Sequence, residues 1–235
     1  LFETKLSIKK SLLTPSCTHA LEMAAILLNI SPGDEVIIPS FTFVSTVNAF
    51  VLRGAKPVFI DIRRDTLNID EALLEPLITK KTKAIIVVHY AGVGCEMEKI
   101  IDIAKRYDVP IVEDNAHGLF GKYNNQYLGS FGTFATQSFH ETKNFTCGEG
   151  GALFINDEKY VKRAEIIREK GTNRSEFFRG EVDKYTWVDI GSSFLMSDLS
   201  AGFLYGQLEK KNKILEKRKK IWDQYYLKLE QWAKN

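Results

Sequence analysis

The chain has 235 residues, of which 44% are hydrophobic and 26% are charged. This composition excludes a disordered chain and is typical of a globular protein with one sizeable core. The formal net charge of +2 gives no global field that would draw the protein to nucleic acid or to an anionic membrane, so a small ligand at a local site is favoured.

Helices and apolar strands alternate along the first half of the sequence. Small polar residues at 16–18 precede a helix over 20–28 that is rich in helix formers and apolar on more than one face. A Pro-Gly-Asp turn then leads into a short β-branched strand over 35–38. The same rhythm predicts helices over 42–53, 70–78 and 97–107, and strands over 57–60, 84–88 and 110–112. Uniformly apolar strands between helices predict an α/β fold, with a mostly parallel sheet covered on both faces.

The second half adds fewer strands and ends in helix. An apolar run over 133–139 predicts a buried strand, and further on the pattern predicts a strand over 152–155 and an amphipathic helix over 157–169. The segment 171–187 is polar and aromatic, which is typical of a long loop that covers a binding site. From Ser197 the pattern is helical, as one long helix or two in tandem. Its apolar residues recur every seven positions, at Leu208, Leu215, Trp222 and Leu229.

Neither the cysteines nor the basic residues form a recognisable ligand motif. Cys95 and Cys147 lie too far apart, and too far from Cys17, for CxxC or zinc spacing, so we expect no metal site and no disulfide framework. The basic run over 210–220 is better explained as the solvated face of a helix than as a nucleic-acid site. No run approaches the roughly 18 apolar residues of a membrane span, and no signal peptide is evident. We therefore expect a cytoplasmic protein that binds neither nucleic acid nor membrane.

Ligands of parallel α/β sheets collect beyond the carboxyl ends of the strands, which makes the residues at those ends the first candidates for a site. Polar or aromatic residues follow five of the predicted strands, at 40–43, Asp61, His89-Tyr90, Glu113-Asp114 and in the stretch that ends at Lys143. Packing alone is a poor explanation for so many polar and aromatic residues at one end of a sheet.

Lys143 is the candidate nucleophile. A lysine after a strand is usually a solvated surface residue, so its catalytic role needs support from other segments. The segment 147–151 is too rich in glycine for a helix, and we expect either an active-site loop that lets the backbone pass close to a bound group, or a tight turn.

Other segments suit the parts of one ligand. Ser16-Cys17-Thr18 at a helix start offers N–H groups, side-chain donors and the helix dipole to a phosphate, although a simple N-cap would also explain it. One carboxylate of Glu113-Asp114 could hold a positively charged ring nitrogen, since a buried acid needs a partner. Phe43 could stack on a planar ring, and His117 could lie beside it, although each alone is better explained structurally. Together these segments match pyridoxal phosphate (PLP) bound to a lysine.

The same segments carry a family resemblance. Ser16-Cys17-Thr18, the stretch Pro39 to Thr46, Glu113 to His117 and Ser138 to Asn144 resemble, in order, the motifs of the DegT/DnrJ-type sugar-nucleotide aminotransferases, which are PLP-dependent enzymes of fold type I. The resemblance covers nearly the whole chain. It implies that 1–196 is the PLP-binding large domain, with an incomplete N-terminus, and that 197–235 is a helical connector toward a small C-terminal domain that is largely missing.

Residue roles follow from the resemblance. It implies that Lys143 binds the cofactor covalently, that Asp114 pairs with its pyridine nitrogen, and that His117 lies near the ring and its 3-hydroxyl. Phe43 would stack on the ring. The phosphate would be bound by Thr18, the Ser16-Cys17 backbone and Ser138, with Ser193 of a second subunit as the remaining ligand.

Two positions depart from the family pattern. Ser193 stands where many relatives have the asparagine of a Gly-x-Asn motif that reaches the phosphate of the neighbouring subunit, and serine is shorter. Cys17 replaces the common glycine of the phosphate loop. The resemblance still implies a homodimer with its active site at the subunit interface, but the contact through Ser193 is open.

Within the family, Ser138 to Asn144, 165–174 and 183–198 resemble the subgroup that makes dTDP-4-amino-4,6-dideoxygalactose for surface polysaccharides such as enterobacterial common antigen. L-glutamate as amino donor and a dTDP-4-keto-6-deoxy sugar, dTDP-4-dehydro-6-deoxyglucose, as acceptor are implied by this resemblance. Two alternatives stay open. The acceptor could be a UDP- or GDP-linked keto sugar, or the chain could be an inactive fragment of such an enzyme. Lys143 argues against the related dehydratases, which have histidine there, and Lys143 with Asp114 argues against a purely sensory or structural protein.

Overall fold

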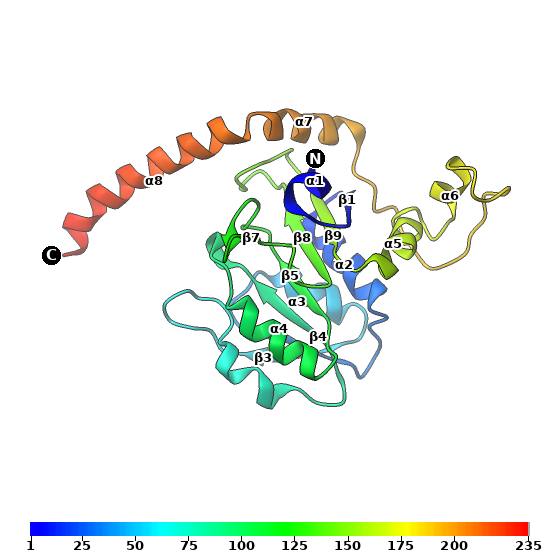
Figure 1. Cartoon of the computed structure of the whole chain (residues 1–235), viewed down its shortest axis with the longest axis horizontal. Helices are drawn as coiled ribbons and strands as arrows, with labels where there is room; N and C mark the ends of the chain where they lie inside the picture. Colours follow the sequence, from blue (N-terminus) through cyan, green and yellow to red (C-terminus); the bar gives the residue numbers. More distant parts are fainter. Residues whose placement is uncertain (235) are drawn as a thin grey trace.

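A seven-stranded sheet forms the centre of the computed structural model, which describes residues 1–234 (Figure 1). Five neighbouring strands run parallel, β9 is antiparallel to β8, and β1 is antiparallel to β9. The mostly parallel α/β sheet predicted from the sequence is therefore confirmed. From one edge to the other the strands are β1 (Lys10–Thr14), β9 (Gly151–Ile155), β8 (Phe134–Ser138), β5 (Ile111–Asp114), β4 (Thr82–Val88), β2 (Glu35–Pro39) and β3 (Lys56–Ile60).

Helices cover both faces of this sheet because its strands are apolar on both sides. On β2, Val36 and Ile38 pack in the core cluster that contains α2 (Cys17–Leu27) and α3 (Val44–Val51). Ile37 between them packs in the opposite cluster, with α4 (Met97–Arg106). Successive residues of a strand point to opposite faces, so this alternation produces three layers. The remaining elements are α1 (Phe2–Leu6), η3 (Tyr90–Gly92), β6 (Lys122–Tyr123), β7 (Gln126–Tyr127), η4 (Glu158–Tyr160), α5 (Val161–Arg168) and α6 (Arg174–Phe178).

One predicted helix is wrong. The segment 70–78 forms two 3₁₀ turns, η1 (Glu71–Leu73) and η2 (Glu75–Leu77), instead of a continuous α-helix. Asp70 caps the first turn by accepting a hydrogen bond from the Ala72 N–H. Pro76 lies in the second turn, where it has no N–H to donate to a preceding turn and where its ring disfavours continuation of an α-helix.

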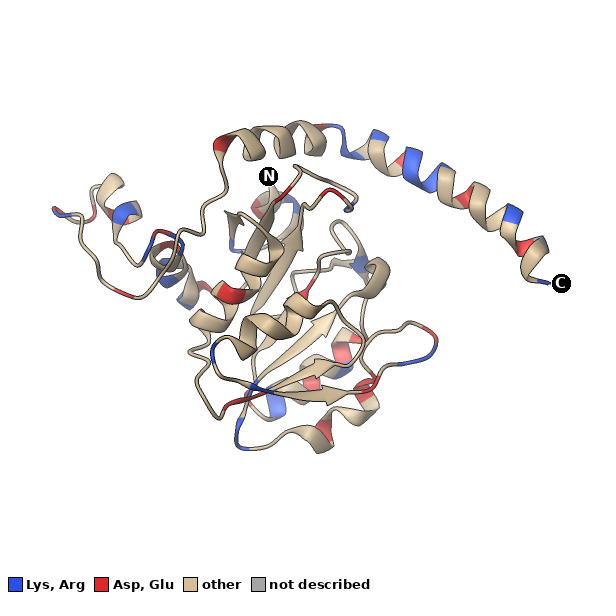
Figure 2. Ribbon diagram, turned by 180° about the vertical axis from the view of Figure 1, so that it is seen from behind, with Lys and Arg blue, Asp and Glu red and all other residues tan. Residues whose placement is uncertain are grey.

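The C-terminal pattern forms two helices in tandem, α7 (Asp198–Glu209) and α8 (Lys211–Ala233). Of the residues with seven-residue spacing, only Leu208 is buried, in a cluster with Phe2 and Leu6, and the other three lie on the exposed surface of α8. Figure 2 shows Lys and Arg positions, in blue, along α8, and most of the predicted basic run is exposed, as expected for a solvated helix face. Among the described helices, none combines the length and the apolar character that crossing a bilayer requires.

Candidate active site

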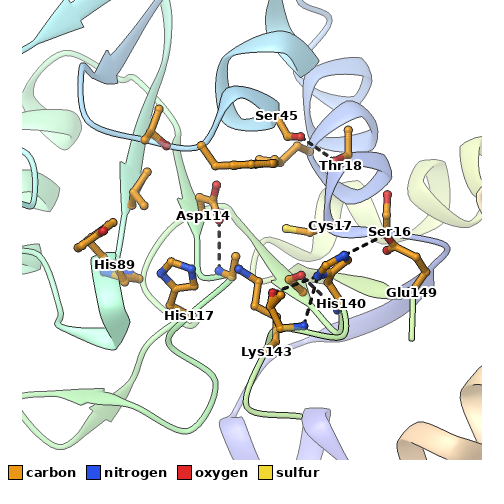
Figure 3. Close-up of a pocket in the computed structure, with 18 of the residues that line it drawn as sticks. Ser16, Cys17, Thr18, Ser45, His89, Asp114, His117, His140, Lys143 and Glu149 are labelled. Carbon is orange, nitrogen blue, oxygen red and sulfur yellow. Dashed lines mark hydrogen bonds and ion pairs between the residues drawn. The ribbon is translucent and has the colours of Figure 1, made fainter. Parts of the chain in front are cut away.

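A cavity of about 640 Å³ lies at the carboxyl ends of the parallel strands, between α2, α3 and the segment that follows β8 (Figure 3). Its walls come from residues that are more than a hundred positions apart in the sequence. Of the residues to which the family resemblance gives a role, all except Ser193 line this one cavity: Ser16, Cys17, Thr18, Phe43, Asp114, His117, Ser138 and Lys143.

Asp114 is held firmly at one end of the cavity. It is the last residue of β5 and is only 5% exposed. Its Oδ2 accepts a hydrogen bond of 2.6 Å from Thr46 Oγ1 and its Oδ1 accepts one of 3.2 Å from the Ala116 N–H. Thr42 Oγ1 in turn donates to Thr46 Oγ1. These hydrogen bonds fix the carboxylate in place at the wall of the cavity.

Glu113 points to the other face of the sheet, because neighbouring residues of a strand alternate. Its carboxylate is completely buried and accepts hydrogen bonds from the N–H groups of Gly129, Phe131 and Gly132. His89 Nε2 lies 2.9 Å from the same carboxylate, and His89 Nδ1 accepts from the Cys95 N–H. Glu113 is therefore a structural anchor, and Asp114 is the carboxylate available to a ligand.

Glu113→Gln is expected to destabilise the fold. The amide nitrogen cannot accept a hydrogen bond, so at least one buried donor would lose its partner, at a cost of about 2 kcal/mol in the free energy of unfolding. Urea unfolding would measure the loss, and Glu158→Gln at an exposed position is the control. Unchanged stability of Glu113→Gln would contradict the anchoring role.

The N-terminus of α2 forms the opposite end of the cavity. Ser16 is the N-cap, and its side chain accepts a hydrogen bond from the His19 N–H. Thr18 Oγ1 donates to Ser45 Oγ at 2.9 Å. The first N–H groups of a helix have no acceptor within the helix and carry the positive end of its dipole, so this end suits an anion. The N-cap and the phosphate-site interpretations of 16–18 are thus compatible.

The glycine-rich segment after Lys143 permits close packing of the backbone. A Cβ atom built on Gly151 would lie 2.4 Å from the Cys17 nitrogen and 2.3 Å from the Ser16 carbonyl carbon. Only glycine allows β9 to begin this close to the helix N-terminus. The close approach found here is to the loop at Ser16 and Cys17, and the predicted approach of this segment to a bound group stays a prediction.

Cys17 lies between the two ends of the cavity (Figure 3). Burial, and after it the charge of Asp114, raises the pKa of the Cys17 thiol well above its usual value. Buried thiols with raised pKa values are poor nucleophiles. We therefore interpret Cys17 as a neutral, space-filling wall of the site.

Lys143 borders this cavity and a second, smaller one of about 330 Å³. Its backbone N–H donates to the His140 carbonyl at 3.0 Å, so a tight turn after β8 positions the side chain. His117, Ser138 and Thr142 border both cavities as well. Lys143 thus lies at the boundary between the two cavities.

His117 lies beside Lys143 and Asp114 (Figure 3). Its Nδ1 accepts a hydrogen bond of 3.2 Å from the Ala91 N–H, which leaves the proton on Nε2. Burial, and then the positive charge of Lys143, lowers the pKa of His117 below its usual 6.5. His117 is therefore a neutral imidazole at neutral pH.

Some residues predicted for the site lie elsewhere. Asp61 follows the edge strand β3 and does not line the cavity. The segment 171–187 contributes no residue to it either, and α6 lies away from the sheet beyond α5 (Figure 1). Ser193 is exposed and pairs with Glu169 instead of reaching its own chain's cavity. Its predicted contact was with a second subunit, and it stays a prediction.

Other residues of the cavity were not singled out from the sequence. Ser45, in the first turn of α3, lines the cavity and accepts a hydrogen bond from Thr18. The neighbouring Thr46 is buried outside the cavity lining and donates to Asp114. A hydroxyl run just past a strand end was the available signal for both. His140 and Glu149 also line the cavity. They flank Lys143 in sequence, but only the folded loops show that both face inward.

These features define the class of protein to which the site belongs. An α/β sheet holds a lysine between a fixed carboxylate and a helix N-terminus that suits an anion, and an aromatic ring borders the space. The fit to PLP is direct, because Asp114 matches the ring nitrogen, the α2 N-terminus matches the phosphate and Lys143 matches the aldehyde. The donor set and the cavity volume suit a ligand of that size.

The family assignment follows from comparison with known proteins. The model of the DegT/DnrJ/EryC1/StrS aminotransferase family matches residues 1–235, and the chain belongs to this family. It is 38% identical over 237 residues to the uncharacterized protein MJ1066 of Methanocaldococcus jannaschii, covering 98% of this chain and 61% of that protein.

Solved structures agree with this assignment. Spr1654, a candidate sugar aminotransferase of Streptococcus pneumoniae, is 32% identical in its apo form, with a TM-score of 0.87 over 95% of this chain and 60% of that one. PseC of Helicobacter pylori, an aminotransferase involved in the biosynthesis of pseudoaminic acid, is 31% identical, with a TM-score of 0.80 over 89% of this chain and 55% of that one. The chain thus spans 55% to 61% of the length of these relatives.

The cofactor is indicated by the same neighbours. Spr1654 is also known in a PLP form and in a pyridoxamine-phosphate form, with TM-scores of 0.86 and 0.87 to this chain. Together with family membership and the fit of the cavity, they indicate pyridoxal phosphate as the cofactor of this site.

Proposed function

We propose that this protein acts as a PLP-dependent sugar-nucleotide aminotransferase. The single observation that carries the proposal is the placement of Lys143 and Asp114 on one cavity that also contains the N-terminus of α2. When bound, PLP supplies an electron-accepting ring and a carbonyl carbon that exchanges amino groups. The residues of this chain then have to hold the ring, keep its nitrogen charged and move protons.

Each residue has one task in this proposal. Lys143 Nζ would hold the cofactor covalently and would serve as the base and acid that moves the proton at the reacting carbon. Asp114 would keep the ring nitrogen protonated by the charge that Thr46 and Ala116 hold in place. His117, as a neutral imidazole, is a hydrogen-bonding partner near the ring. Phe43, 73% exposed at the cavity, offers a flat apolar surface for stacking.

The proposed substrates come from the subgroup resemblance. L-glutamate is the proposed amino donor, and the 4-keto group of dTDP-4-dehydro-6-deoxyglucose is the proposed acceptor, which would place the product in surface polysaccharides of the enterobacterial common antigen type. A homodimer is proposed in which Ser193 reaches the phosphate of the neighbouring subunit. The exposed aromatic residues Phe41 and Phe43 at the cavity support a covering partner surface.

Half-reactions test this proposal. After loading with PLP, addition of L-glutamate is expected to bleach the absorbance band of the lysine-bound cofactor and to yield 2-oxoglutarate in stoichiometric amount. A keto sugar should then restore the band, and a panel of dTDP-, UDP- and GDP-linked keto sugars identifies the nucleotide. Recovery with a UDP- or GDP-linked sugar alone would overturn the dTDP assignment, and a chain that binds PLP but does not bleach would contradict aminotransferase activity.

A further inference from the structure

The phosphate end of the cavity is poor in cationic side chains. Among the described residues that line the cavity, Lys143 is the only lysine and there is no arginine. Its amine is assigned to the carbonyl carbon of the cofactor and cannot also bind the phosphate. The helix dipole and hydroxyl groups of α2 offset part of a phosphate charge, but a further N–H donor would strengthen this site.

His140 stands at this end. It lines the same cavity as Ser16, Thr18 and Ser138, and its backbone N–H donates to Ser138 Oγ at 3.4 Å. Figure 3 shows its imidazole on the side of the cavity where Ser16 and Glu149 lie, opposite Asp114. The other imidazoles of the cavity are committed elsewhere, since His89 is buried against Glu113 and His117 lies beside Asp114.

The orientation of the His140 ring is set by Thr142. Its Nδ1 accepts a hydrogen bond from the Thr142 N–H at 3.3 Å and lies 3.0 Å from Thr142 Oγ1. Because Nδ1 is an acceptor, the neutral ring carries its proton on Nε2. Nε2 lies 3.6 Å from Glu149 Oε1, which exceeds the 2.7–3.2 Å typical of a hydrogen bond. The Nε2–H group is therefore oriented, partly exposed, and without a protein acceptor within hydrogen-bond distance among the described residues.

We propose that His140 Nε2–H is a direct hydrogen-bond donor to the phosphate of the bound cofactor, and that Glu149 is its partner when no phosphate is bound. This inference rests on the proposed function, since it assigns a ligand within the PLP site. Glu149 is mostly exposed and lies next to Ser16, so its charge opposes a bound phosphate while it keeps the imidazole close. His140 is thus a residue that touches the cofactor, and Glu149 is an acidic neighbour that competes with the phosphate for the imidazole.

Two ligands that differ only in the phosphate test this assignment. Calorimetric titration of the apoprotein with pyridoxamine 5′-phosphate and with pyridoxamine measures the contribution of the phosphate without a covalent bond to Lys143. His140→Phe is expected to weaken binding of the phosphorylated ligand roughly tenfold and to leave pyridoxamine binding unchanged. His140→Gln, which keeps a donor near the position of Nε2, should recover most of the lost affinity.

Variants of the acidic residues complete the series. Glu149→Gln is expected to strengthen binding of the phosphorylated ligand by about threefold, because a like charge is removed. Glu141→Gln is the matched control, since Glu141 is exposed in the same turn but does not line the cavity, and it should change neither affinity. Equal losses for both ligands in His140→Phe, or no loss for either, would overturn the assignment. A wild-type protein that binds neither PLP nor pyridoxamine 5′-phosphate would instead overturn the proposed function itself.

Discussion

Lys143→Ala is expected to lower the rate of both half-reactions by at least about a thousandfold. The substitution removes the amine that binds the cofactor covalently and the group that moves the proton at the reacting carbon, and each role alone contributes a large factor. The cavity should still form, because Lys143 makes its described backbone contact through the N–H to the His140 carbonyl, which alanine keeps. Cofactor binding should therefore weaken, and the absorbance band of the lysine-bound cofactor should disappear, without loss of the fold.

Borohydride reduction gives a direct measurement of the covalent bond. In the wild-type protein loaded with PLP, peptide mapping after reduction should find the pyridoxyl label on Lys143, and Lys143→Ala should carry none. Lys213→Ala, at an exposed position of α8, is the matched control and should label as the wild type does. A label at another lysine, or activity of Lys143→Ala within a few fold of the wild type, would refute the nucleophile assignment.

The sequence predicts the layers of this fold because the signals are local and strong. The apolar strand over 84–88 and the amphipathic helix over 97–107 are found within one or two residues of their predicted bounds. The prediction of a helix over 70–78 is wrong for an equally local reason. The apolar spacing of this segment suits a helix, whereas Asp70 and Pro76 favour short 3₁₀ turns. Periodicity did not decide between one and two C-terminal helices, and the structure has two, with Leu208 before the break and Ile214 after it packed on the same apolar cluster.

The site is predictable only in part. The residues at the strand ends were found because parallel strands bring their carboxyl ends to one edge, which explains Asp114 and Lys143. The residue pattern alone did not separate Asp114 from Glu113, and only the family resemblance favoured Asp114, because the distinction depends on which face of β5 each side chain occupies and on donors from 129–132. The position of His140 relative to Glu149 likewise depends on two loops that pack only in the folded chain.

Asp114→Asn is expected to reduce the rate of transamination by about a hundredfold to ten-thousandfold while the protein stays folded. Asparagine has nearly the same shape, its Oδ1 can accept the Ala116 N–H, and the Thr46 hydroxyl can rotate to accept from Nδ2. The amide, however, has no charge to hold a proton on the ring nitrogen, so the ring would be a weaker electron acceptor. The loss should therefore appear in the rate of proton abstraction, measured by stopped-flow absorbance with L-glutamate, far more than in stability.

A graded series separates charge from orientation. Thr46→Val keeps the Asp114 carboxylate but removes its 2.6 Å hydrogen bond at little change in volume, and we expect roughly a tenfold loss of rate. Asp114→Asn should lose much more, because the charge itself is absent. Equal losses of rate in the two variants would mean that the orientation of the Asp114 side chain, and not its charge, determines the rate. Full activity of Asp114→Asn would remove Asp114 from the proposed chemistry altogether.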